Sequence, residues 1–288
     1  MKIKTSKESA KFDGDTDDLA EFPSSFLSVE NPITRITATE IPVTHPAEPD
    51  MFARHDGVPA HDQAALSGKR IVLVGGGGLN SWVAVGLARS GARRLTVIDP
   101  DRVDRTNLSR QFFFQEDLGE LKGMRLAANL ERQAVGGAAI TGIGLPFEEA
   151  LEDFSIDADI LVVGVDNNSC RLAAAQEARR RRIPAVFSML SRDGMRCQVF
   201  YQDPTTIEPC LWCALPNLDP DKIMPCASAI ISSCFMAAAF TTFFVHRGLM
   251  GWGTIERFNW READLTGMAL NQTGMIKKRE DCPVCSGG

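Results

Sequence analysis

The chain has 288 residues, 44% of them hydrophobic and 24% charged, which is enough apolar material for one large core or a core with a small appendage. A formal net charge of −6 gives no basic field to replace phosphate counterions, and this argues against nucleic acid as the main partner. The polar start lacks an apolar signal region, and the long apolar stretch 227–245 is interrupted by Ser, Thr and Cys. We therefore predict a buried helix there, no membrane segment and a cytoplasmic location.

Residues 1–50 are rich in Ser, Thr, Asp, Glu and Pro, a composition that buries too little apolar surface to form a domain. A β-prone patch at Ile33–Val43 allows one short strand. We expect a partly disordered N-terminal extension, followed by one domain at residues 51–288. Docking of a partner by the extension is an alternative to plain disorder.

A strand, a glycine-rich turn and a helix follow one another at residues 71–91. The apolar run Ile71–Val74 is typical of a strand buried on both faces. The helix is predicted to open near Asn80 or Ser81 and to stop at Gly91, so its N-terminal amides face the turn. Three glycines let the backbone come close to phosphate: Gly75, Gly77 and Gly78. Because Asn80 breaks the strict G-x-G-x-x-G pattern, the turn alone fits a structural turn as well as a nucleotide loop.

A second strand, Leu95–Ile98, ends in Asp99, about 20 positions beyond the glycines, where a carboxylate is placed to bind a ribose hydroxyl. A polar loop then stands where a dehydrogenase would enter its next crossover helix. The loop contains four candidate ligand-binding residues: Asp101, Asn107, Arg110 and Gln111.

A helix over 121–134 and further strands complete the pattern. Apolar runs indicate strands at 139–145, 158–165 and 184–190, and alternation indicates an antiparallel strand at 195–201. The fourth strand ends in Asp166 and Asn167. Strand-end carboxylates of a parallel sheet face the ligand crevice, so we expect Asp166 to bind magnesium or phosphate; capping of the next helix is the alternative.

Two C-x-x-C pairs, Cys210/Cys213 and Cys282/Cys285, each supply two thiolates from a tight turn. Two such turns complete a tetrahedral site with no open position, so we predict structural Zn²⁺. The predicted fold is therefore α/β: a Rossmann-like, mostly parallel sheet flanked by helices, with an antiparallel C-terminal extension and a zinc knuckle.

The string D-x-D-x-V-x-x-x-N-L-x-R-Q at Asp99–Gln111, followed by Gly119 and Lys122, resembles the adenylation domain of the ubiquitin-activating enzymes. The same string is similar to the ThiF-type sulfur-carrier adenylyltransferases of molybdopterin and thiamine synthesis. The resemblance extends over Ala65–Cys285 and includes the cysteine pairs in the same order.

The resemblance implies an enzyme that adenylates the C-terminal glycine of a ubiquitin-like or sulfur-carrier protein with ATP and Mg²⁺. Arg110 and Lys122 would neutralise phosphates, and Asp166, beside Asn167, would hold Mg²⁺. Asp99 would bind the ribose, with Asp101 in support. The remaining contacts to the nucleotide would come from Asn107, Gln111 and the three glycines.

Cys226 is the candidate nucleophile. It follows Pro225 and is predicted to open the helix that begins at Ala227, where the helix dipole stabilises a thiolate. In several relatives a cysteine at the corresponding place takes the activated carboxyl group as a thioester or persulfide, and in others it is dispensable. The other three cysteines, Cys170, Cys197 and Cys234, are interpreted as small buried hydrophobes.

The family implies a homodimer, in which Arg54 is the candidate to reach the partner's nucleotide. A conjugating enzyme is a further expected partner, because the N-terminal extension and the string at Cys226 favour a bacterial conjugation-type activating enzyme. The alternative within the family is sulfur-carrier activation without a thioester step. An NAD-dependent oxidoreductase would leave Arg110, Lys122 and Asp166 unexplained. An inactive scaffold would have lost these charges, and the acidic composition and zinc pairs disfavour a tRNA-modifying relative.

Overall fold

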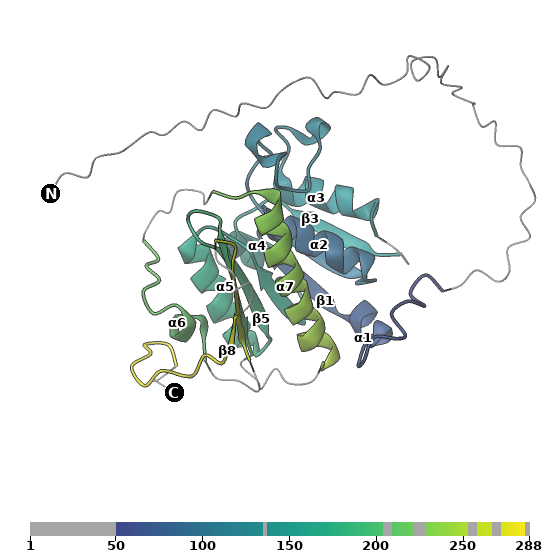
Figure 1. Ribbon diagram of the computed structural model, residues 1–288. Helices are drawn as coiled ribbons and strands as arrows, with labels where there is room; N and C mark the ends of the chain where they lie inside the picture. Colours follow the sequence, from purple (N-terminus) through teal and green to yellow (C-terminus); the bar gives the residue numbers. More distant parts are fainter. Residues whose placement is uncertain are drawn as a thin grey trace, which may run out of the picture. The chain divides into compact units, whose positions relative to one another are not determined.

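The computed structural model describes residues 50–134, 137–203, 209–221, 228–252, 258–266 and 272–285 (Figure 1). The predictions for the N-terminal extension and for the placement of Cys226 lie outside these residues. No helix in the described ranges is long and apolar enough to cross a membrane.

The described chain forms one eight-stranded sheet in the order β3-β2-β1-β4-β5-β6-β7-β8. The first five strands in this order pair in parallel and the last three pair antiparallel, as the sequence predicted. The strands are β1 (Arg70–Val74), β2 (Arg94–Ile98), β3 (Ala139–Ile143), β4 (Ile160–Val163), β5 (Ala185–Leu190), β6 (Arg196–Gln202), β7 (Trp260–Asp264) and β8 (Gln272–Gly274).

Helices cover both faces of the sheet, because the central strands are apolar on both sides. Ile71 and Leu73 of β1 pack on one face and Val72 and Val74 on the other. The first face is covered by α1 (Gln63–Gly68), α2 (Asn80–Arg89), α3 (Lys122–Glu131) and α7 (Ile231–Met250). The second is covered by α4 (Phe147–Asp153), α5 (Asn168–Arg181) and α6 (Leu211–Ala214). In Figure 1, α2 and α7 lie side by side across the sheet.

The apolar stretch predicted as a buried helix from Ala227 to Val245 differs from the structure in two respects. Helix α7 begins at Ile231 and ends at Met250, and residues 228–230 are not helical. Only one face of α7 is buried, since Phe235 is 47% and Phe243 36% exposed. The sheet supplies a single apolar surface to pack against, so the side chains on the opposite face of the helix point outward.

The polar loop between β2 and α3 is a fixed structure. It contains two 3-10 turns, η3 (Arg105–Asn107) and η4 (Gln115–Asp117). The Asp117 side chain, fully buried, accepts hydrogen bonds from Phe114 N (2.8 Å), Arg125 Nε (2.7 Å) and Asn129 Nδ2 (2.7 Å). Burial alone would raise the pKa of Asp117, but these hydrogen bonds and the Arg125 charge outweigh it and lower the pKa below its ordinary value.

We predict that Asp117→Ala lowers the free energy of unfolding by about 3 kcal/mol at pH 7, because it leaves buried donors without their acceptor. The stabilisation by a carboxylate with a lowered pKa is complete above the unfolded value of about 4 and is lost as the pH falls through the folded value. The difference between wild type and variant should therefore shrink in acid. Urea unfolding at pH 7 and in acid measures this difference in the free energy of unfolding. Glu116→Ala, at an exposed neighbouring residue, is the control. Equal stability of wild type and Asp117→Ala would contradict this account of the loop.

Candidate functional site

A cleft of about 480 Å³ opens at the carboxyl ends of the parallel strands. It brings together every predicted nucleotide-binding residue that the structure describes. These lining residues are Gly75, Gly77, Gly78, Asp99, Asp101, Asn107, Arg110, Gln111, Lys122, Asp166 and Asn167. They come from three strand ends, the polar loop and the first turn of α3, so residues more than 90 positions apart in sequence share one wall.

The glycine turn after β1 is held by the Asp99 carboxylate. Asp99 Oδ2 accepts from Gly76 N at 2.6 Å and Oδ1 accepts from Asp101 N at 2.9 Å. Burial is the main cause of a raised pKa at Asp99, and the charge of Lys122 and the two amide hydrogen bonds oppose it. The residue predicted to bind a ribose therefore also fixes the turn on which phosphate would lie.

Position 75 requires glycine because of its backbone conformation and because neighbouring atoms leave no room for a side chain. Its φ is +88°, and a Cβ there would lie 2.9 Å from Val165 Cγ1 and 3.1 Å from Gly164 O. A side chain at this position would push the ends of β1 and β4 apart, so glycine keeps the cleft floor closed.

Asn80, the residue that breaks the glycine fingerprint, ties the cleft floor together. Its Nδ2 lies 3.0 Å from each of three carbonyl oxygens, those of Val74, Gly75 and Val162. The side chain is fully buried and stands in the first turn of α2, where the sequence predicted the helix to open. The departure from glycine thus supplies a bridge between the ends of β1 and β4.

Two cations reach the cleft from the polar loop and α3. Lys122 is the first residue of α3, and its Nζ lies 2.8 Å from Asp101 Oδ2. Its side chain is only 10% exposed, whereas that of Asp101 is 68% exposed. Arg110 donates from Nη1 to Thr106 O at 2.6 Å, and its backbone carbonyl accepts from Trp82 Nε1 at 2.9 Å. Both cations are held in place by this chain's own groups.

Asp166 and Asn167 follow β4 and line the cleft beside the glycine turn. Asn167 caps α5, because its Oδ1 accepts from Cys170 N at 3.1 Å. The alternative interpretation of Asp166 as the cap is therefore wrong.

Arg171 is a cleft residue to which the sequence analysis gave no role. It is 8% exposed and lies one turn into α5. Burial lowers the pKa of its guanidinium, and the negative charge of Asp166 opposes that shift. A cation one helical turn after a strand-end Asp-Asn pair is the sequence signal that could have identified it.

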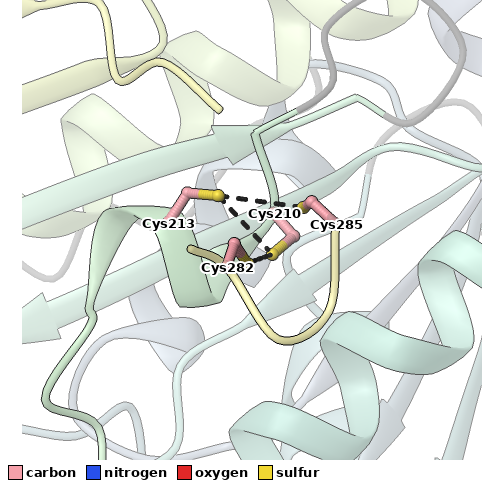
Figure 2. Close-up of side chains that lie close together, drawn as sticks. All are labelled: Cys210, Cys213, Cys282 and Cys285. Carbon is pink, nitrogen blue, oxygen red and sulfur yellow. Dashed lines mark hydrogen bonds between the residues drawn. The ribbon is translucent and has the colours of Figure 1, made fainter. Parts of the chain in front are cut away.

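The four cysteines of the predicted zinc site converge, although the pairs lie 72 residues apart (Figure 2). Their sulfur atoms are separated by 3.6 Å (Cys210 to Cys282), 3.7 Å (Cys213 to Cys285) and 4.0 Å (Cys210 to Cys213). Four thiolates about 2.3 Å from one ion at tetrahedral angles lie about 3.8 Å apart, whereas a disulfide needs about 2.05 Å. The buried cluster therefore fits a tetrahedral metal ion and not a pair of disulfides.

The surroundings of the other three described thiols raise their pKa values. Burial raises the pKa of Cys234, which lines the cleft, and that of Cys197. Burial, aided by the charge of Glu148, raises the pKa of Cys170 to about 12. These environments favour the neutral thiol, in agreement with their interpretation as structural residues.

For Cys226 the structure removes one premise. The helix it was predicted to open begins at Ile231, with Ile230 as its N-cap residue, so Cys226 is not in the first turn of α7. Its own placement lies outside the described residues, and a thiolate there cannot be argued from the α7 dipole, whose effect falls off within one turn.

Several curated proteins are similar to this chain. The SAMP-activating enzyme E1 of Haloferax volcanii is 25% identical over 253 residues, which are 83% of this chain and 89% of the relative. The sulfur carrier protein adenylyltransferase of Thermus thermophilus is 28% identical, over 77% of this chain and 84% of the relative. The NEDD8-activating enzyme E1 catalytic subunit of Caenorhabditis elegans is 36% identical over 37% of this chain, and the match spans 25% of that relative's length.

Solved structures agree with the fold. The crystal structure of E. coli MccB with ATP superposes with a TM-score of 0.65 at 21% identity, over 77% of this chain and 68% of that one. The selenomethionine crystal structure of PaaA gives a TM-score of 0.61 at 18% identity, over 75% and 67% of the two chains. The model of the ThiF family matches residues 52–284, which include the cleft and three of the four clustered cysteines, Cys210, Cys213 and Cys282. This chain belongs to the ThiF family.

Proposed function

We propose that the protein is an adenylyltransferase that activates the C-terminal glycine of a ubiquitin-like or sulfur-carrier protein. The observation that carries the proposal is the gathering of Arg110, Lys122 and Asp166 around one glycine turn. In this reaction a carboxylate oxygen attacks the α-phosphate of ATP, an acyl adenylate forms and pyrophosphate leaves. Two anions must approach each other, so the chemistry depends mostly on placed positive charge.

The cleft residues divide into binding and neutralising groups. Backbone amides of the glycine turn and the start of α2 face the phosphates, and Asp99 binds the ribose while it braces the turn. Asn107 and Gln111 complete the contacts to the phosphates or the adenosine. Gln111 Oε1 is buried without a hydrogen-bond partner within the described chain, as expected of an acceptor that a bound nucleotide would satisfy.

Charge neutralisation falls to Arg110 and Lys122, with Asp101 keeping the Lys122 ammonium pointed into the cleft. Asp166, next to Asn167, would hold Mg²⁺, an ion that carboxylate oxygens suit and that is bound through one or two carboxylates and substrate phosphates. When bound, Mg²⁺ supplies charge compensation for the pyrophosphate that departs.

The identity of the carboxyl substrate is supported by the names of relatives that match most of their own length, a SAMP-activating and a sulfur-carrier-activating enzyme. The chain spans less than half the length of the NEDD8-activating relatives it matches. Sulfur-carrier activation without a thioester is the alternative to conjugation, in which a conjugating enzyme would be a further partner.

We predict that the protein exchanges pyrophosphate into ATP only when a glycine-tailed ubiquitin-like or sulfur-carrier protein is present. Lys122→Ala should lower this exchange about 100-fold or more, because it removes a charge that stabilises the transition state. Radiolabelled pyrophosphate measures the exchange, and Lys277→Ala, at an exposed lysine outside the cleft, is the control. If Lys122→Ala and Asp166→Ala both keep the wild-type rate, the proposal is wrong.

We propose that the cysteine cluster holds one structural Zn²⁺, since four thiolates leave no open position for chemistry. The ion would join the chain end to the segment after β6. Metal analysis should give one zinc per chain, and Cys282→Ser should lose both the ion and several degrees of melting temperature. Cys170→Ser, at a thiol outside the cluster, should retain it. A metal-free protein that melts at the same temperature with and without chelator would count against the site.

A thioester on Cys226 stays a prediction. The raised pKa values of Cys170, Cys197 and Cys234 make these thiols weaker candidates for attack on an acyl adenylate. Incubation with ATP, Mg²⁺ and the modifier should give a covalent species that a thiol reducing agent cleaves. Cys226→Ala should abolish this species while pyrophosphate exchange persists. Persistence of the species in Cys226→Ala would move the nucleophile elsewhere, and absence of any such species in wild type would favour the sulfur-carrier alternative.

We also propose that the chain forms a homodimer through the α2–α7 groove, a hollow of about 480 Å³ lined mainly by aromatic and small side chains. Trp82 and Phe235 line it, and the exposed Ile230 and Ile231 lie at the same end of α7. An apolar surface of this kind usually marks an interface. Whether Arg54 reaches across such a dimer stays a prediction.

Sedimentation at micromolar concentration should therefore give twice 31.4 kDa. Phe235→Glu should shift the protein to monomer, because a carboxylate would be buried in the interface. Phe154→Glu, at a comparably exposed phenylalanine outside the groove, should leave the dimer intact. A wild-type monomer would refute the dimer.

A further inference from the structure

At the start of α5, Arg171 and Asn168 form a buried chain of side-chain hydrogen bonds, which we call the relay. The proposed nucleotide chemistry does not use it. Arg171 folds back over its own helix and donates from Nη2 to Val165 O and from Nη1 to Asn168 Oδ1, the latter at 2.7 Å. Arg171 and Asn168 are 8% and 9% exposed. The guanidinium therefore lies inside the turn whose middle residues, Asp166 and Asn167, line the cleft.

The position of Arg171 is unfavourable for a cation. Helix N-termini repel positive charge and burial removes its hydration, and the Nε atom is buried without a hydrogen-bond partner within the described chain. Its two donated hydrogen bonds and the nearby charge of Asp166 offset part of this cost. A buried arginine in such an unfavourable position has a structural purpose when its planar guanidinium holds two acceptors in a fixed geometry.

Asn168 extends the relay to a second part of the chain. Its Nδ2 donates to Asp219 O at 2.9 Å. Because a guanidinium only donates and a carbonyl only accepts, the amide has one workable orientation, with Oδ1 toward Arg171 and Nδ2 toward Asp219. Arg171 and Asp219 O therefore favour the same orientation of Asn168, and each hydrogen bond supports the other.

Asp219 belongs to the strap, which we define as residues 214–221, directly after Cys213 of the cysteine cluster. Leu215 and Leu218 of the strap pack partly buried against the core face that carries α5. The strap is thus held at its start by the cysteine cluster and near its end by Asn168.

We propose that Arg171 and Asn168 are positioning residues: Arg171 fixes the turn that places Asp166 in the cleft, and Asn168 fastens the strap to that turn at Asp219. The role of Asp166 in Mg²⁺ binding rests on the proposed function, whereas the anchoring of the strap does not. The Arg171 guanidinium then influences both the placement of Asp166 in the cleft and the anchoring of the strap.

The two halves of the relay can be separated by substitution. Asn168→Asp keeps an acceptor for Arg171 but replaces the donor to Asp219 O with an oxygen that repels it. Arg171→Met removes both hydrogen bonds to the turn and releases Asn168. Arg171→Lys restores the charge without the two-pronged geometry. Arg180→Met, at an arginine of the same helix that pairs with Glu177, is the matched control.

Two measurements on the full chain are informative. Hydrogen–deuterium exchange of peptides covering the strap, on the protein without nucleotide, reports anchoring. The Mg²⁺ concentration at which ATP binding reaches half of its maximum, measured by calorimetry, reports the placement of Asp166. We call this concentration the Mg²⁺ requirement. In Asn168→Asp we expect strap exchange to rise about tenfold with the Mg²⁺ requirement nearly unchanged. In Arg171→Met we expect both to rise about tenfold, and Arg171→Lys should recover only part of the loss.

Unchanged strap exchange in Asn168→Asp, or an unchanged Mg²⁺ requirement in Arg171→Met, overturns the proposal. Full recovery by Arg171→Lys would also overturn it, because charge alone would then suffice. If Arg171→Met unfolds, exchange rises in β1 and β4 as well, and Asn168→Asp and Arg171→Lys decide the matter. A wild type that binds no ATP at any Mg²⁺ concentration refutes the proposed function, while strap exchange in Asn168→Asp still tests the anchor.

Discussion

The hydrogen bonds of the Asp99 carboxylate are the interaction on which the cleft depends. Its two oxygens hold the amides of Gly76 and Asp101 at 2.6 and 2.9 Å. One buried side chain therefore fixes the glycine turn after β1 and the start of the polar loop after β2. Because Asp99 is 6% exposed, its charge needs these amides and the nearby Lys122 to remain favourable. The geometry of the glycine turn and that of the polar loop are in this way determined by one side chain.

Two cations of the cleft stand where a positive charge is electrostatically unfavourable, and each is paired with a nearby group. Lys122 and Arg171 both stand in the first turn of a helix, where the dipole repels positive charge. Lys122 is paired with Asp101, and Arg171 is hydrogen-bonded to Val165 O and Asn168 Oδ1. Each of these cations is therefore held in a fixed position by groups of its own chain.

The cysteine cluster and the strap connect distant parts of the chain. The cysteine cluster joins residues 210–213 to residues 282–285, and the strap that follows the first pair reaches Asn168. The strap is thus held by the cysteine cluster at its start and by the Asn168 amide near its end. The Asp117 network holds the polar loop, which forms part of the cleft wall.

The sequence by itself predicted the strands β1 to β6 in their succession along the chain and the mostly parallel direction of the sheet, because continuous apolar runs that end in glycine or aspartate are typical of buried parallel strands. It also predicted the grouping of the two cysteine pairs and the meeting of the candidate nucleotide-binding residues, since strand-end side chains of a parallel sheet meet at one edge. Only the tertiary structure decided the remainder. Asn80 looked like a defect in a glycine pattern, yet its value lies in reaching carbonyls of β1 and β4, which are adjacent only after folding. Helix α7 starts four residues later than its composition predicted, and its outer face is exposed, because packing on the sheet and not hydrophobicity sets both. The hydrogen bond from Asn168 to Asp219 O could not be predicted from local pattern, because the two residues are 51 positions apart and meet only after folding.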